Sequence, residues 1–194
     1  MIKDLGFEVK NSTTANDSVS GTTGDAGTSG GGSSGRPGGC FAPGTKILMA
    51  DFTLKNIEDI KIGDIIMAYN EVNKKFAPKK VIESYPHYNT PKIIEINFNN
   101  GNKLLMTPGH PILTVNGWKS RDIENSLYEH KTITKLLTVN DLVYCYGNKL
   151  LSIDSIKDVD ISDDYISYNI AIEDYHTFIA NNIIVHNSYQ KQIQ

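Results

Sequence analysis

The sequence places a cysteine where a polar, glycine-rich stretch ends and a more apolar segment begins. This residue is Cys40, and its immediate neighbour on the N-terminal side is Gly39. A thiol is the best of the common side-chain nucleophiles, with roughly a few per cent thiolate at neutral pH. Gly39 has no side chain that would obstruct an attack on its carbonyl group. The junction therefore indicates that the Cys40 sulfur can take over the acyl group of Gly39.

A tight turn supplies a second set of groups. Thr107-Pro108-Gly109-His110 follows a predicted strand, and its spacing lets Thr107 and His110 point at one peptide bond. An amide nitrogen is a poor leaving group, and the imidazole can protonate it as a general acid. The Thr107 hydroxyl or a backbone N–H can hold the developing oxyanion. We therefore expect this turn to serve the bond between Gly39 and Cys40.

The end of the apolar segment carries a third set of reactive groups. His186 precedes Asn187, and Ser188 follows directly. An asparagine amide can attack its own main-chain carbonyl to give a succinimide, which breaks the chain after Asn187. The neighbouring His186 can transfer the protons, and His176, earlier in the same predicted hairpin, can act as a second proton shuttle. The hydroxyl of Ser188 can accept an acyl group from a thioester at Cys40.

These groups lie at the ends and turns of a segment whose composition favours β-structure. Runs of Ile, Val, Tyr, Phe and Thr alternate with turn signals such as Asn-Gly. Many short strands at close spacing predict an all-β domain. The stretches 54–60 and 120–136 are predicted as short helices or loops. The expected strands are 45–50, 64–69, 80–85, 92–98, 103–106, 112–115, 142–146, 149–156, 165–172, 177–180 and 183–186.

Composition changes sharply between Gly39 and Cys40. Residues 11–39 are rich in Ser, Thr, Gly, Asn and Asp and offer almost nothing to bury, so 1–39 is predicted as a flexible flank. Segment 40–187 is the predicted folded domain, and 188–194 is a polar C-terminal flank. The scissile junctions are thus Gly39/Cys40 and Asn187/Ser188.

The net charge, the lack of long apolar stretches and the cysteine content limit the kinds of binding partner and the cellular compartment that can be expected. A formal net charge of -3 without a dense Lys/Arg run argues against nucleic-acid binding. No signal peptide and no apolar stretch of roughly 18 residues is visible, so no membrane partner is expected. The two cysteines, Cys40 and Cys145, do not make a disulfide framework, which favours a reduced, intracellular protein. Cys145 lies on a predicted strand and is interpreted as a core thiol, with a redox partner for Cys40 as the alternative.

Three segments together resemble the inteins and the related hedgehog/intein-type (Hint) domains. The opening Cys40-Phe41-Ala42-Pro43-Gly44-Thr45 is similar to the first motif of that family. The Thr107–His110 turn resembles its Thr-x-x-His motif, and the stretches 168–181 and 185–187 look like its two closing motifs. The resemblance spans 40–187. It implies an all-β, horseshoe-shaped, pseudo-twofold Hint fold with both termini at one site.

The resemblance also implies protein splicing, in four steps. Cys40 takes the Gly39 acyl group, Ser188 takes it over, Asn187 cyclises, and the resulting ester rearranges to an amide. Such a domain acts in cis and once, so it is not a multiple-turnover enzyme. It needs no cofactor and no metal. A monomer is expected, acting in the cytoplasm of a bacterial host at the time of processing.

Two further features qualify this resemblance. No homing-endonuclease motif is visible, so the chain resembles a minimal intein, and the Thr107–His110 turn followed by Gly117-Trp118 also looks like bacterial intein-like domains, which often cleave more than they splice. Many inteins have Asp where this chain has Asn169. Because an asparagine cannot act as a base, its presence implies looser coupling of the early steps.

Other interpretations of these residues stay open from sequence. The first is self-cleavage at one or both junctions without ligation. The second is a metal-binding module formed by Cys40 with His110, His176 and His186, although the spacing lacks a paired ligand motif; Zn²⁺ can also inhibit by capturing the Cys40 thiolate. The third is a Cys–His hydrolase acting on other proteins. His87 and His130 are interpreted as surface residues and Trp118 as a packing residue.

Overall fold

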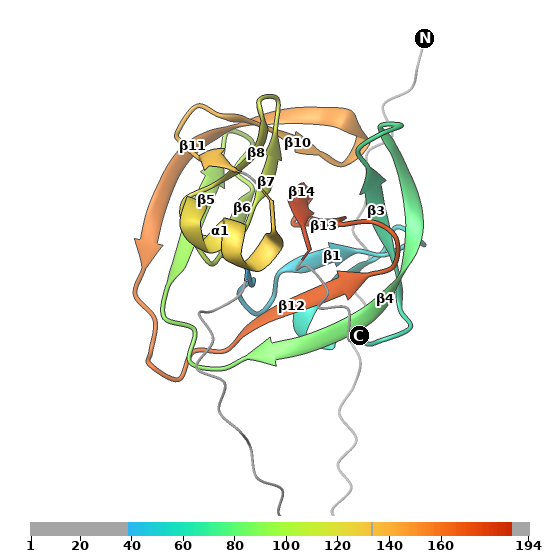
Figure 1. The fold of residues 1–194 in the computed structure, drawn as a ribbon, viewed down its shortest axis with the longest axis horizontal. Helices are drawn as coiled ribbons and strands as arrows, with labels where there is room; N and C mark the ends of the chain where they lie inside the picture. The colour runs from blue at the N-terminus through green and yellow to red at the C-terminus, as the bar shows by residue number, and fades with distance from the viewer. Residues whose placement is uncertain (1–38, 133, 188–194) are drawn as a thin grey trace, which may run out of the picture. The chain divides into compact units, whose positions relative to one another are not determined.

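The computed structural model describes residues 39–132 and 134–187, and these residues form a domain built mostly of β-strands (Figure 1). They make one sheet of eleven strands and one of three strands. Every strand pairing is antiparallel except one short parallel pair. The all-β prediction is therefore confirmed. The predicted flanks, apart from Gly39, lie outside the described residues.

The larger sheet gathers strands from the whole domain. Its strands are β1 (Lys46–Leu48), β2 (Leu54–Asn56), β5 (Ile93–Phe98), β6 (Lys103–Met106), β7 (Ile112–Thr114), β8 (Gly117–Ser120), β9 (Lys135–Leu136), β10 (Leu142–Cys145), β11 (Lys149–Val159), β13 (Thr177–Ala180) and β14 (Ile183–His186). They follow the order β2-β1-β13-β14-β7-β10-β11-β5-β6, and β8 joins β7 to β9. The closing hairpin β13–β14 is therefore central, which puts its last residues beside β7.

The smaller sheet has the order β12-β4-β3. Its strands are β3 (Ile65–Asn70), β4 (Lys75–His87) and β12 (Ser167–Ile172). Helical structure is limited to α1 (Ile123–His130) and two short 3₁₀ turns, η1 (Ile57–Asp59) and η2 (Tyr146–Asn148). Within 39–132 and 134–187, no helix is long and apolar enough to cross a membrane.

All eleven predicted strands are present, eight of them with shifted bounds, and three short strands were missed. Strand β4 is much longer than the predicted 80–85, because it pairs with β3 along a hairpin from Ile65↔Lys80 to Asn70↔Lys75. The stretch 54–60 is β2 followed by η1, and 120–136 contains α1 and β9. The missed strands β2, β8 and β9 have at most four residues and show no apolar alternation that would reveal them.

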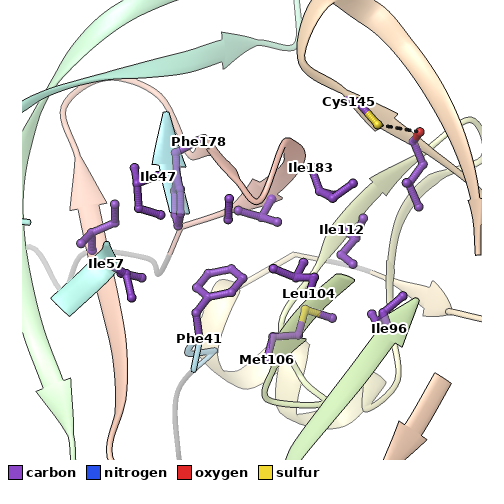
Figure 2. Close-up of a cluster of buried hydrophobic side chains, with 14 of the residues drawn as sticks. Phe41, Ile47, Ile57, Ile96, Leu104, Met106, Ile112, Cys145, Phe178 and Ile183 are labelled. Atoms are coloured by element: carbon purple, nitrogen blue, oxygen red, sulfur yellow. Dashed lines mark hydrogen bonds between the residues drawn. The ribbon is translucent and has the colours of Figure 1, made fainter. Parts of the chain in front are cut away.

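The core between these strands is aliphatic with two central phenylalanines (Figure 2). The rings of Phe41 and Phe178 meet edge to face with centroids 5.8 Å apart, a favourable geometry for aromatic pairs. Cys145 belongs to this core, and burial raises the pKa of its thiol to about 11. A thiol with so little thiolate is inert, which agrees with its interpretation as a core residue. Cys40 and Cys145 are not joined by a disulfide.

Phe41 joins the two sheets and thereby fixes the residue before it. It forms one isolated bridge to Tyr168 of β12 and another to Met106 of β6. The amides of Phe41 and Tyr168 exchange two hydrogen bonds of 2.8 Å. Because Thr107 directly follows β6, this clamp brings Cys40 next to the Thr107–His110 turn.

Candidate active site

The first junction is held by reciprocal hydrogen bonds between Cys40 and Thr107. The N–H of Cys40, which belongs to the bond after Gly39, donates to the Thr107 hydroxyl at 2.9 Å. The N–H of Thr107 donates to the Cys40 carbonyl at 2.9 Å. Cys40 is fully buried. The sequence left open whether this hydroxyl or a backbone N–H would hold the oxyanion, and the contact places the hydroxyl at the amide nitrogen of Cys40.

His110 closes the other side of the junction. Its N–H donates to the Thr107 carbonyl at 3.2 Å, which completes the predicted turn. The buried ring packs on Phe41 with centroids 4.1 Å apart. Burial first, and then the neighbouring His130 and His186, hold the pKa of His110 well below its usual range, although backbone groups of Gly39 and His186 oppose this. His110 is therefore neutral at pH 7 and able to accept a proton.

Gly39 fits between two imidazole rings with no space for a side chain. A Cβ atom on Gly39 would overlap Nε2 of His130 and would lie 2.7 Å from Nδ1 of His110. Both separations are shorter than any real Cβ contact. A glycine is thus required at this position by close approach rather than by backbone conformation.

Replacing Gly39 with alanine is expected to slow cleavage at Gly39 by about a hundredfold, because one ångström of misplacement at a reacting group has that order of effect. Thiol-induced release of residues 1–39, followed by mass spectrometry in an Asn187→Ala chain, measures the rate. Gly38→Ala is the control for changing the flank itself. An unchanged rate for Gly39→Ala would contradict the close packing described here.

At the second junction, the Asn187 side is buried as well. Asn187 is buried, and its main-chain N–H donates to the His176 carbonyl at 2.8 Å. Its side-chain amide satisfies both partners when the nitrogen donates to the His176 carbonyl (3.2 Å) and the oxygen accepts from the Ile172 N–H (3.2 Å). The predicted nucleophile is therefore held by backbone groups of Ile172, at the end of β12, and of His176, in the loop before β13.

Two histidines contact the main-chain carbonyl oxygen of Asn187. Nδ1 of His186 lies 2.6 Å from this oxygen and Nδ1 of His130 lies 2.9 Å from it. A carbonyl oxygen can only accept, so both Nδ1 atoms carry the proton in these hydrogen bonds. Burial lowers the pKa of His186 to about 3 and that of His130 to about 4, so both rings are neutral at pH 7. Nε2 of His186 lies 3.0 Å from the Thr132 hydroxyl, whose single proton serves either this nitrogen or the His130 carbonyl oxygen at 3.1 Å.

The remaining candidates are His176, Asn169 and Ser188. His176 is exposed, and its ring stacks on that of His186 with centroids 5.9 Å apart and planes inclined by 10°. This path from solvent to a buried ring suits the predicted proton shuttle. Asn169 is buried on β12, and its side-chain oxygen accepts from the Ile170 N–H at 2.8 Å. Ser188 lies outside the described residues.

His130 is the functional residue that the sequence interpretation missed. It was interpreted as a surface residue, and this is wrong, because only 1% of it is exposed. Helix α1 buries Ser126 and His130 while exposing Ile123 and Leu127. This reverses the pattern of an amphipathic helix, so hydrophobic periodicity gave no signal for it.

The two junctions therefore share one buried histidine cluster. The ring centroids of His110 and His130 are 4.9 Å apart, and those of His130 and His186 are 5.4 Å apart. His130 contacts Asn187 through Nδ1 and faces Gly39 through Nε2. Trp118 packs edge-on against His186, as a packing residue would. Across the described part of the chain, no three His, Cys, Asp or Glu side chains are grouped as a metal ion would require.

The lowered pKa values predict that the folded domain loses stability in acid. In an unfolded chain a histidine has a pKa of about 6.5. Below that pH the unfolded chain binds protons that the folded domain does not, so the free energy of unfolding falls from about pH 6.5 toward the folded pKa of about 4 at His130. The loss is roughly 1.4 kcal/mol per pH unit for each such histidine, or about 2 kcal/mol between pH 6.5 and 5.

Urea unfolding of a Cys40→Ala, Asn187→Ala chain at both pH values measures this loss. Adding His130→Asn is expected to make the loss of stability between pH 6.5 and pH 5 smaller by the contribution of one histidine, about 2 kcal/mol. A free energy of unfolding that stays the same at pH 6.5 and pH 5 would contradict the neutral, buried state of the cluster.

Comparisons with known proteins find a matching family and similar structures. A family model described as an intein splicing domain matches residues 47–187. A bacterial intein-like domain from Clostridium thermocellum is 26% identical with a TM-score of 0.64, covering 76% of this chain and 98% of its own. A DnaB intein from Synechocystis is 25% identical with a TM-score of 0.61, covering 78% and 99%. A search of curated proteins finds no match.

Proposed function

Because the chain belongs to the family of intein splicing domains, we propose that residues 40–187 excise themselves and join Gly39 to Ser188. Residues 1–39 and 188–194 are then the two flanks that become joined. The observation that carries this proposal is the shared cluster, in which His130 contacts both Gly39 and Asn187. Joining two flanks requires both scissile bonds at one place, which a protein with a single cleavage site does not need.

The first step moves the Gly39 acyl group from nitrogen to sulfur. Neutral His110 accepts the thiol proton of Cys40, and the sulfur attacks the Gly39 carbonyl carbon. The carbon–nitrogen bond breaks, and His110 passes the proton to the leaving nitrogen. The Thr107 hydroxyl, which accepts the N–H of Cys40 at 2.9 Å, holds that nitrogen in place while its geometry changes.

The next steps exchange the acyl group and release the domain. The Ser188 hydroxyl attacks the thioester, so that an ester forms and the Cys40 thiol is regenerated. The Asn187 amide then attacks its own carbonyl, and the bond to residue 188 breaks. Finally, the free amine of residue 188 displaces its own ester oxygen to give the amide between Gly39 and Ser188. Only acyl bonds are exchanged, so each chain reacts once, in cis.

Self-cleavage without ligation is the second candidate function, and Asn169 supports it. Its buried side-chain oxygen accepts from the next N–H along β12. An amide cannot take up a proton as a carboxylate can, so this residue cannot tie the first step to the second by proton transfer. Water can then compete with Ser188 for the thioester.

Intact mass spectrometry of the freshly made chain over time tests the proposal and separates these two outcomes. A product that joins 1–39 to 188–194 supports splicing, and a released 40–187 carrying a C-terminal succinimide supports the release step. The two flanks released separately, without a joined product, would replace splicing by self-cleavage. A Cys40→Ala, Asn187→Ala chain is the control and should stay intact; an unprocessed parent chain would overturn both functions.

A further inference from the structure

His130 has contacts that the proposed steps above do not use. Its Nδ1 lies 2.9 Å from the main-chain oxygen of Asn187. This oxygen belongs to the carbonyl that the asparagine side chain attacks. The other nitrogen, Nε2, is buried without a hydrogen bond in the described structure and faces Gly39. The His130 side chain thus contacts both Gly39 and Asn187, the residues whose carbonyl groups react.

The protonation of the ring follows from these contacts. The carbonyl oxygen requires a proton on Nδ1, so in the neutral ring Nε2 carries none. The Cα of Gly39, which faces Nε2, is neither a hydrogen-bond donor nor an acceptor. It therefore does not favour the other tautomer. His130 therefore presents a fixed N–H donor to the Asn187 oxygen, and His186 presents a second one at 2.6 Å.

We infer that His130 is a catalytic residue of the release step at Asn187, forming with His186 an oxyanion hole for the cyclising carbonyl. This inference rests on the proposed function. When the side-chain nitrogen of Asn187 attacks, the carbonyl oxygen gains negative charge, and two donors already aimed at it stabilise that charge most in a buried site. The energetic benefit arises without reorganisation of the donors.

The step balances without consuming the histidine proton. A bond forms between the Asn187 side-chain nitrogen and the carbonyl carbon, and the bond from that carbon to the nitrogen of residue 188 breaks. The attacking nitrogen loses one proton, and the leaving nitrogen gains one. The products are a succinimide and a free amine, and His130 keeps its Nδ1 proton throughout.

Local structure explains why His130 can aim so accurately. It is the last residue of α1, whose first turn is capped by the Asp122 carboxylate accepting from the Asn125 N–H. The helix stops at Lys131, which has a left-handed conformation with φ of 53° and an N–H that donates to the Leu127 carbonyl. The ring is then packed edge-on between His110 and His186. A donor held on a capped helix end has little freedom to turn away.

Two single-cut backgrounds isolate the release step from the first step. In a Cys40→Ala chain only cleavage at Asn187 is followed, and in an Asn187→Ala chain only thiol-induced cleavage at Gly39. His130→Ala is expected to lower the release rate by about a hundredfold, which is the usual effect of removing one oxyanion donor. The ring also faces Gly39, so the rate of cleavage at Gly39 is expected to fall too. Its loss should be at least tenfold smaller than the loss of the release rate at Asn187. His87→Ala, on β4, is the matched control and should leave both rates unchanged.

Conservative variants separate donation from mere packing. Asparagine places its amide nitrogen near the position of Nδ1, whereas glutamine reaches toward Nε2. His130→Asn is therefore expected to recover at least tenfold of the loss, and His130→Gln less than this. Circular dichroism and urea unfolding confirm that each variant is folded.

Three results would overturn the inference. One is release from His130→Ala at the parent rate, and another is a folded His130→Asn chain as slow as the alanine variant. The third is an equal loss at Gly39 and Asn187, which would indicate a packing role. If the Cys40→Ala chain with His130 intact releases nothing at Asn187, the proposed function fails as well; in the other three cases it survives.

Discussion

A chain with alanine in place of Cys40 is expected to form no joined product, while release at Asn187 continues. The Cys40 sulfur is the thiol next to the Gly39 carbonyl, so its loss removes the thioester route, an effect of at least a thousandfold. The backbone contacts of Cys40 with Thr107 do not involve the sulfur and remain. The second junction therefore keeps its geometry. Mass spectrometry should find 1–187 and 188–194, and no 1–39 fragment.

Cys145→Ala is the matched control for this substitution, because Cys145 is the other buried cysteine. Its thiol lies in the hydrophobic core and is inert. The control is expected to keep the joined product while losing about 1 to 2 kcal/mol of stability to a small cavity. If Cys40→Ala still joined its flanks, the first step would not run through a thioester.

The fold was largely predictable because its strands repeat short β-branched and aromatic runs between clear turn signals. Strands β6, β13 and β14 begin and end where the sequence predicts. The sequence could not reveal the length of β4, whose pairing with β3 depends on a hairpin rather than on alternation. It also could not reveal β9, a strand of two residues held by parallel pairing with β8. Such elements exist because of tertiary contacts, which leave no local pattern.

The site was predictable where chemistry ties residue types to adjacent positions. Cys40 and Asn187 each adjoin the carbonyl on which they are proposed to act, so their proposed roles follow from order alone. The sequence could not show which side chains meet across the fold. The Thr107 hydroxyl contacts the amide nitrogen of Cys40 because the Phe41 clamp sets the register there. His130 reaches Asn187 from a helix whose polar face is buried, and no spacing rule connects these two residues.

Asn187→Ala is expected to stop release at Ser188 and to make the Gly39 junction sensitive to added thiols. The alanine side chain has no nucleophile, so cyclisation ceases, again by at least a thousandfold. The acyl shift at Cys40 still operates, because the contacts of Cys40 with Thr107 and of Phe41 with His110 do not involve the Asn187 side chain. Acyl groups resting on Cys40 or Ser188 then accumulate and are captured by the thiol. Mass spectrometry should show 1–39 as a thioester and 40–194 as its partner.

The stability cost of this variant is separable from its chemistry. Alanine leaves the Ile172 N–H without the side-chain oxygen that it meets at 3.2 Å, and an unpaired buried donor costs about 1 to 3 kcal/mol. Asn116→Ala, on an exposed turn, is the control for an asparagine that serves no such role. If the folded Asn187→Ala chain still released 188–194, hydrolysis by water would have to break that bond. The donors from His130 and His186 would then serve an external nucleophile, and the domain would be a protease of its own C-terminal flank rather than a splicing domain.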